Sequence, residues 1–477
     1  MKIKKDIIQI QNGLFDHMVV QRYSSGYGRI SFSGCCAGNN AGDLCLRAKN
    51  GSWLVIGRVS GGAWRGLIRR IPVGGPYAFE IGIRDKMRRM VATTQIKDVY
   101  VGDVWVLAGQ SNMVGDGLLA ESEKALPSVR CFYMDDTWGP AKDPLHCSAA
   151  AFDRIHHVLA GRDGPVGARK KIDRGRCRGT GCGISFANEM TRTLDIPIGL
   201  IACAHGGTSL TQWLPSKQSV VSDSLYGALL RRVRKNGGAV TGILWYQGEA
   251  DTNYADAVHF KSRMKRLISN LRRDLNAPCL PFVQAQLARL HTTETGFKEY
   301  LWMFVREQQR QLGLELKRTA AVGTLDLVMK DSVHVNASGL VRLGHRMAKA
   351  ALALVKNKKT SMHPVCPNIF SAAFKRGHDG VFVEAMFEGV NGRLTALGEP
   401  VGFRIIGEYG WELSVFNTKL QDNKAQIFFC DDNPRRERFF LYYGYGTHSV
   451  CNIIDAEDCA LLGFGPFPIG VKPPYPE

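Results

Sequence analysis

The chain has 477 residues, of which 45% are hydrophobic and 22% charged, and its formal net charge is +19. This length exceeds what one hydrophobic core usually supports, so two or three domains are expected. No apolar run approaches the length of a transmembrane helix, which argues against a membrane protein. Lysines near the start are not followed by an apolar segment, so the sequence predicts a cytoplasmic protein unless an export signal has been removed.

Cysteines and charges narrow the function classes further. The 13 cysteines are mostly scattered, and their odd number favours reduced thiols over a complete set of disulfides. No CxxC pair or HExxH motif occurs, so neither a metal nor a cofactor is expected. Many cations fall within residues 154–178, a stretch that is either a solvated loop or a funnel for acidic sugars. No nucleic-acid recognition motif accompanies this charge, so we expect no nucleic-acid partner. The oligomeric state cannot be read from the sequence.

The expected elements divide the chain into three domains. Residues 1–98 carry short alternating apolar segments between glycine turns, which predicts an N-terminal β domain. Residues 99–356 alternate buried strands with amphipathic helices, which predicts an α/β fold with a doubly wound, largely parallel sheet. The strands are expected at 104–108, 129–134, 197–203, 241–246, 280–287 and 320–326, and the helices at 183–194, 223–235, 255–275, 299–314 and 337–356. A basic linker at 356–359 precedes a C-terminal β domain over 360–477.

A serine follows the first strand of the central domain. Residues 109–113 read Gly-Gln-Ser-Asn-Met, so the hydroxyl of Ser111 is expected at the carboxyl end of a strand, where open α/β sheets bind their ligands. Acyl transfer by serine also needs a base, a group that orients the base, and hydrogen-bond donors for the oxyanion.

His334 is the best candidate for the base, with Asp331 three residues before it as the orienting carboxylate. Spacing alone is weak, because the chain holds three other Asp-x-x-His sequences: Asp143/His146, Asp153/His156 and Asp256/His259. What separates His334 is its position between the last strand and the last helix, on the same predicted sheet edge as Ser111.

Two more strand ends offer polar groups. One strand runs into His205-Gly206-Gly207-Thr208, where glycines let backbone amides approach a substrate closely. The next ends in Gln247-Gly248-Glu249-Ala250-Asp251. The two acids either act on the sugar and on His334, or cap the following helix and pair with arginines. Likewise, Trp213 and Trp245 either stack on the sugar at the sides of the binding site or belong to the hydrophobic core.

These segments resemble the signature blocks of the sialate O-acetylesterase family, a branch of the SGNH serine hydrolases. The blocks are Gly109-Gln110-Ser111-Asn112-Met113, His205-Gly206-Gly207-Thr208-Ser209 with Trp213, Trp245-Tyr246-Gln247-Gly248-Glu249 and Asp331-Ser332-Val333-His334. Further likeness lies in Leu14 to Arg22, Gly74-Gly75-Pro76-Tyr77 and Val101 to Trp105.

The resemblance implies an SGNH, flavodoxin-like α/β/α domain that removes acetyl groups from sugar hydroxyls without a metal. It assigns Ser111 as the nucleophile, His334 as the base and Asp331 as its partner. The oxyanion hole would comprise the amide of Ser111, an amide of Gly206 or Gly207, and Gln247. Gln247 replaces the asparagine of the wider superfamily. Trp213 and Glu249 are the candidates for substrate binding.

Two alternatives stay open at this point. The same triad would serve an esterase acting on acetylated xylan or another polysaccharide, although the basic stretch favours an acidic sugar. A carbohydrate-binding protein without turnover is the second, because β domains flank the centre. An intact Ser111, Asp331 and His334 set argues against it.

Overall fold

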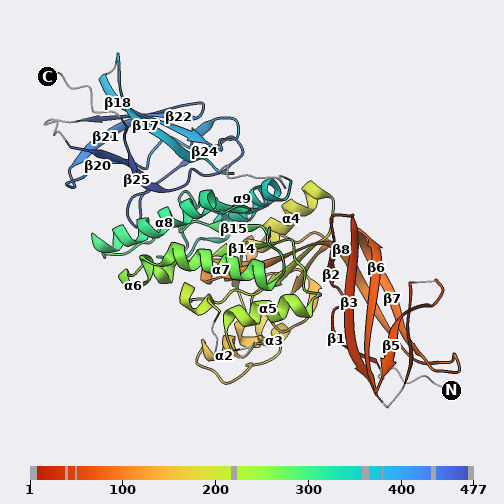
Figure 1. Cartoon of the computed structure of the whole chain (residues 1–477). Helices are drawn as coiled ribbons and strands as arrows, with labels where there is room; N and C mark the ends of the chain where they lie inside the picture. The colour runs from red at the N-terminus through yellow and green to blue at the C-terminus, as the bar shows by residue number, and fades with distance from the viewer. Residues whose placement is uncertain are drawn as a thin grey trace.

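The computed structural model describes residues 8–37, 41–48, 51–215, 223–356, 365–378, 380–430 and 437–470. Figure 1 shows three parts in a row: a β structure near the N-terminus, a sheet covered by helices, and a second β structure near the C-terminus. The expected mixed α/β architecture is therefore confirmed.

The N-terminal β structure is joined to the central sheet by one long strand, β8 (Met90–Gly109). β8 pairs antiparallel with β7 as far as Val101 and parallel with β13 from Asp103 onward. The predicted domain boundary after residue 98 thus falls inside a continuous strand. The reason is burial, because every residue from Val99 to Gly109 is buried and none is free to act as a linker. The other strands here are β1 (Ile8–Asn12), β2 (Val19–Gln21), β3 (Tyr27–Cys36), β4 (Gly42–Ala48), β5 (Leu54–Ser60), β6 (Ala63–Pro72) and β7 (Gly74–Arg84).

The central sheet has the strand order β11-β10-β13-β8-β14-β15-β16, and every neighbouring pair except β10 and β11 is parallel. Numbered in chain order, the six parallel strands β8, β10, β13, β14, β15 and β16 give the order 2-3-1-4-5-6. The chain continues on one side of β8 as far as β13 and on the other side from β14, so the switch point, where such sheets bind ligands, lies at the carboxyl end of β8. The bounds are β10 (Val129–Phe132), β11 (Trp138–Pro140), β13 (Ile198–Ala202), β14 (Gly242–Tyr246), β15 (Phe282–Ala285) and β16 (Thr319–Val322). A separate small pair joins β9 (Gly117–Leu118) to β12 (Arg178–Thr180).

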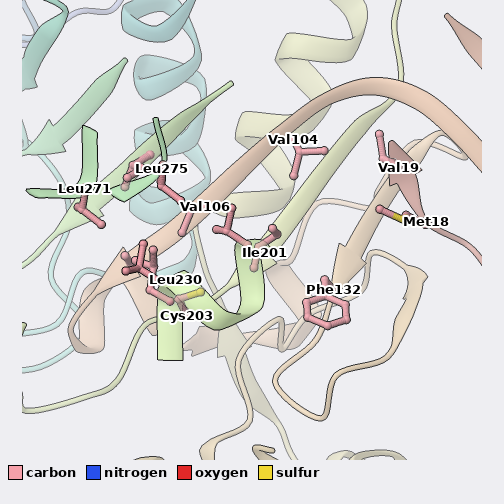
Figure 2. Packing of buried hydrophobic residues seen from close by; sticks show 14 of the residues in the cluster. Met18, Val19, Val104, Val106, Phe132, Ile201, Cys203, Leu230, Leu271 and Leu275 are labelled. Carbon is pink, nitrogen blue, oxygen red and sulfur yellow. The ribbon is translucent and has the colours of Figure 1, made fainter. Parts of the chain in front are cut away.

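Both faces of this sheet are covered, because successive side chains of β8 point to opposite faces and pack in different apolar clusters. Val104 and Val106 belong to one apolar cluster with Leu230 and Leu271, seen in Figure 2. Trp105, the residue between the two valines, belongs to a second cluster on the other face. The helices are α1 (Ser111–Val114), α2 (Ile155–Val158), α3 (Arg169–Asp173), α4 (Gly183–Leu194), α5 (Leu225–Lys235), α6 (Tyr254–Ala257), α7 (Phe260–Asp274), α8 (Phe297–Glu315) and α9 (Ala337–Lys356). Short 3₁₀ turns are η1 (Leu119–Glu121), η2 (Ser148–Ala150), η3 (Leu210–Trp213) and η4 (Glu249–Asp251).

The helix expected over 255–275 is two helices, α6 and α7, whereas α4 and α9 have the expected bounds. Asn336 begins α9, because its side-chain oxygen accepts a hydrogen bond from the amide of Gly339 at 2.8 Å. No helix among the described residues is both long enough and apolar enough to cross a membrane.

The C-terminal β structure packs on the helices of the central sheet. Buried Arg306 of α8 donates hydrogen bonds to the carbonyl oxygens of Gly444 and Gly446 at 2.9 and 2.7 Å. The predicted linker residues 357–359 lie outside the described residues. The strands are β17 (Asn368–Gly377), β18 (Gly380–Glu388), β19 (Leu394–Ala396), β20 (Phe403–Gly407), β21 (Glu412–Gln421), β22 (Lys424–Cys430), β23 (Phe439–Tyr443), β24 (Ile453–Asp455) and β25 (Phe464–Pro468).

Candidate active site

Ser111 is the first residue of α1, directly after β8, in a tight turn. Gly109 has a φ of +131°, and a Cβ at this position would lie 2.1 Å from the carbonyl oxygen of Tyr246. Only glycine fits there. The amide of Gln110 donates to the same oxygen at 2.8 Å, which fixes the turn to the end of β14. This local geometry holds the serine at the switch point of the sheet.

The loop after β13 lies beside Ser111. A Cβ built on Gly206 would be 3.8 Å from the Cβ of Ser111, and the amide of His205 donates to the carbonyl of Gly109 at 3.0 Å. Gly206 and Gly207 are exposed. Within the described part of the chain, the amides of Ser111, Gly206 and Gly207 donate to no protein acceptor. The geometry therefore leaves backbone donors available around the serine, as an oxyanion hole requires.

His334 and Asp331 contact each other as the spacing predicted. The Nδ1 atom of His334 lies 2.9 and 3.1 Å from the two carboxylate oxygens of Asp331. Burial acts to raise the pKa of Asp331, but the amides of Val333 and His334 and the His334 ring together hold that pKa well below its ordinary value. Asp331 therefore stays ionised at neutral pH and can orient the imidazole.

Lys330 supplies a cation next to this pair. Its ammonium group contacts the carboxylate of Asp116 and lies 3.3 Å from that of Asp331. Potential metal-ligating atoms of Asp116, Asp331 and His334 lie within 4.8 Å of one another. Lys330 thus provides positive charge to both carboxylates.

Asn112 joins the serine turn to the histidine loop, a link that sequence reasoning missed. Its side-chain oxygen accepts from the amide of Val335 at 3.0 Å, and its side-chain nitrogen donates to the carbonyl of Val333 at 3.2 Å. These two residues flank His334. The same nitrogen donates to a carboxylate oxygen of Glu249 at 2.7 Å. Asn112 is only 1% exposed, so the residue after the candidate nucleophile anchors the candidate base.

Glu249 and Asp251 differ in what they contact. Burial raises the pKa of Glu249. The hydrogen bond from Asn112 and the charge of a protonated His334 ring act in the opposite direction and lower it. Burial raises the pKa of Asp251 to about 6, although the amide of Leu210 donates to both of its oxygens at 3.1 and 2.9 Å. Asp251 thus fastens the loop after β13 to the end of β14, which is a structural role. A role of Glu249 in binding sugar stays a prediction.

Gln247 is fully buried, and its side-chain nitrogen donates to the carbonyl of Thr208 at 3.1 Å and also contacts Asp251. Both of its N–H groups are therefore engaged in this structure. Service in an oxyanion hole would require Gln247 to release one of these bonds, so that assignment remains a prediction.

The prediction that Trp213 binds substrate is wrong for this structure. Trp213 is 0% exposed, packs edge-on against Trp245 with ring centroids 5.2 Å apart, and donates to the hydroxyl of Thr208 at 3.0 Å. The two tryptophans are core residues, the alternative that sequence analysis left open.

The other Asp-x-x-His sequences form no comparable pair. Asp153 is bonded to Arg231, and Asp256 is bonded to Arg263. Asp143 accepts a hydrogen bond from Ser122, and both ring nitrogens of buried His146 lack a side-chain partner among the described residues.

His156 has a different contact, with the loop beside Ser111. Its Nδ1 atom lies 2.9 Å from Nδ1 of His205, so at least one ring must be neutral. Burial, together with the charges of Arg162 and His157, lowers the pKa of His205 to about 4. The Nε atom of Arg162 is buried and has no protein partner among the described residues. Arg162 comes from the predicted basic stretch, whose Arg169 and Arg176 are instead paired with Asp173.

Known proteins resemble this chain in sequence and fold. A sequence model of the family described as "Carbohydrate esterase, sialic acid-specific acetylesterase" matches residues 101–353. A probable carbohydrate esterase of Arabidopsis thaliana is 31% identical over 273 residues, which cover 52% of this chain and 90% of the relative. Human sialate O-acetylesterase is 23% identical over 350 residues, which cover 65% of this chain and 64% of the human protein.

Among solved structures, a carbohydrate acetylesterase from Xanthomonas citri has the same fold over most of its length. The TM-score is 0.68 at 20% identity, with 96% of this chain and 99% of that chain covered. The family match spans slightly more than half of the chain and includes every strand of the central sheet, except the beginning of β8. The chain therefore belongs to the family of sialic acid-specific acetylesterases, which are carbohydrate esterases.

Proposed function

We propose that this protein removes O-acetyl groups from carbohydrates through an acetyl-serine intermediate on an SGNH-type domain. Ser111 is the nucleophile, His334 the general base and Asp331 the carboxylate that orients it. The observation that carries the proposal is the pairing of His334 with Asp331 at 2.9 Å, on a loop that Asn112 anchors next to Ser111.

The reaction proceeds in two halves. The hydroxyl oxygen of Ser111 attacks the acetyl carbonyl carbon while His334 accepts the hydroxyl proton. The amides of Ser111 and of Gly206 or Gly207 donate hydrogen bonds to the resulting oxyanion. The bond to the sugar oxygen breaks, and His334 returns the proton to that oxygen. Water then attacks the acetyl-Ser111 ester with His334 again as the base, which releases acetate and restores the serine.

Arg162 supports an acidic sugar as the substrate. Its buried, unpartnered Nε atom and its proximity to His205 leave a cation available near the loop that flanks Ser111. Such a guanidinium can bind the carboxylate of a sialic acid through charge-assisted hydrogen bonds. A neutral acetylated polysaccharide such as acetylxylan lacks that group and would gain nothing from Arg162.

Deacetylation of O-acetylated sialic acids and of acetylated xylo-oligosaccharides, measured side by side, tests both parts of the proposal. Ser111→Ala should lower kcat by on the order of 10³-fold or more while leaving thermal unfolding unchanged. The parent protein, quenched during turnover, should show an acetyl group on Ser111 by mass spectrometry. Full activity of a folded Ser111→Ala protein would refute the nucleophile, and equal kcat/KM on both substrates would refute the preference for an acidic sugar.

A further inference from the structure

Three aromatic side chains form a continuous exposed surface, here called the aromatic platform: Tyr254 of α6, and Phe297 and Tyr300 of α8. Their exposed fractions are 67%, 57% and 44%. The rings of Tyr254 and Phe297 have centroids 5.9 Å apart, and those of Phe297 and Tyr300 are 6.3 Å apart with planes only 14° from parallel. Tyr300 in turn stacks on Phe304 at 5.7 Å, which supports the platform from below.

The platform is not needed to fold α8. The helix already buries a different set of residues against the domain, including Leu301, Trp302, Val305 and Leu312. Phe297, Tyr300 and Phe304 follow helical spacing on a second apolar face. Single exposed apolar residues are ordinary, but contiguous exposed rings mark interaction surfaces.

The residues of the platform lie close, along the chain, to segments at the carboxyl edge of the sheet that carries the candidate active site. Tyr254 lies only five residues after Glu249, so their Cα atoms are at most about 17 Å apart, and Glu249 is bonded to Asn112 next to Ser111. Lys298 ties the first turn of α8 to this segment, because its ammonium group donates to the carbonyl and the hydroxyl of Thr252 at 3.1 and 3.0 Å. Figure 1 shows α6 beside one end of α8.

The loop that leads into α8 also contacts the histidine loop. The amide of His291 donates to the carbonyl of Ser332 at 2.8 Å, two residues before His334. The segments that carry the platform are thus linked to both sides of the candidate site, by Lys298 to the segment that follows Glu249 and by His291 to the His334 loop.

We propose that the aromatic platform is a sugar-binding subsite, which holds a ring of an oligosaccharide whose acetyl ester reacts at Ser111. This inference rests on the proposed function and extends it, because it adds to the site of the acetylated sugar a subsite for a further ring of an oligosaccharide. Aromatic faces carry negative electrostatic potential, and the C–H groups on one side of a pyranose ring are weakly positive, so the two surfaces stack. The hydroxyl groups of Tyr254 and Tyr300 can also bond to the sugar.

Steady-state kinetics with substrates of different length test the subsite. The triple variant Tyr254→Ala/Phe297→Ala/Tyr300→Ala should raise KM for an acetylated tetrasaccharide on the order of 10-fold and leave kcat unchanged. With the matching acetylated monosaccharide, both constants should stay within twofold of the parent. The matched control is Tyr409→Ala/Phe416→Ala, which removes rings that are 81% and 63% exposed on the C-terminal β structure and should change neither substrate.

A binding measurement separates this inference from the proposed mechanism. Ser111→Ala protein, which does not turn over, should bind the unacetylated tetrasaccharide, and the triple variant in the same background should lose that binding. If the Ser111→Ala enzyme stays active while the platform variant loses affinity, only the proposed nucleophile fails. An unchanged ratio of tetrasaccharide to monosaccharide KM overturns the subsite. A parent dimer that the triple variant converts to monomer also overturns it, because the platform would then be a contact between two copies of the chain.

Discussion

Removal of the Asn112 side chain should uncouple the candidate base from the candidate nucleophile. Asn112→Ala deletes three hydrogen bonds: to Glu249 at 2.7 Å, to the Val333 carbonyl at 3.2 Å and from the Val335 amide at 3.0 Å. Val335 is fully buried, and the second carboxylate oxygen of Glu249 already lacks a partner among the described residues. The variant therefore leaves a buried amide and a buried carboxylate without their donors or acceptors.

The magnitude follows from these three groups. A buried polar group that loses its partner costs about 1–3 kcal/mol, and water entering the small space recovers part of this, so we expect a loss of roughly 2–4 kcal/mol in the free energy of unfolding. A domain with an ordinary stability of about 5–15 kcal/mol remains folded. Because the His334 loop is no longer tied to the Ser111 turn, kcat should fall on the order of 10²-fold with little change in KM.

Asn188 of α4 provides a matched control. Its side chain makes the same three kinds of bond: to the carboxylate of Glu123 at 2.7 Å, to the Lys124 carbonyl at 2.9 Å and from the Leu126 amide at 2.9 Å. Asn188→Ala should lose a similar amount of stability in urea unfolding at pH 7 but retain the parent kcat. If Asn112→Ala and Asn188→Ala lower kcat equally, or if Asn112→Ala leaves kcat within twofold of the parent, the coupling is refuted.

Three further outcomes are expected. Asp331→Asn should lower kcat by on the order of 10⁴-fold, because the amide no longer favours the reactive tautomer of His334; a kcat within tenfold of the parent would exclude that role. Arg162→Ala should lower kcat/KM for O-acetylated sialic acids on the order of 10-fold and spare acetylated xylo-oligosaccharides, whereas an equal loss on both would argue against carboxylate recognition. The pKa of His205 is lowered to about 4 in the folded protein. Between pH 6.5 and 4 this histidine is therefore protonated in the unfolded chain but neutral in the folded one, so the free energy of unfolding decreases as the pH falls. Urea unfolding of His205→Asn should therefore show a decline over this window that is smaller by up to about 3 kcal/mol; identical pH dependence in both proteins would contradict it.

Local sequence patterns predicted the elements of the central domain well. The bounds of α4 and α9 were expected from apolar periodicity, and the parallel strands were expected from short buried runs. Ser111 was placed at a strand end because it follows the short apolar run of residues 104–108. Such features depend on residues close together in the chain, and the sequence therefore contains them directly.

Contacts between distant segments required the tertiary structure. Asn112 bonds to residues more than 200 positions away, and no local pattern distinguishes it from an ordinary helix-start asparagine. The burial of Trp213 and the continuity of β8 across the expected boundary also depend on which segments pack together.

The sequence by itself determined the central α/β fold, the serine at the carboxyl end of β8 and a histidine on the loop after the last strand, because hydrophobic period and turn chemistry are local properties. Only the tertiary structure decided how Asn112 joins the serine turn to the histidine loop, which polar groups around Ser111 are already engaged, and which aromatic rings stay exposed. Those outcomes depend on the packing of segments that lie far apart in the chain, where burial and hydrogen-bond satisfaction are decided.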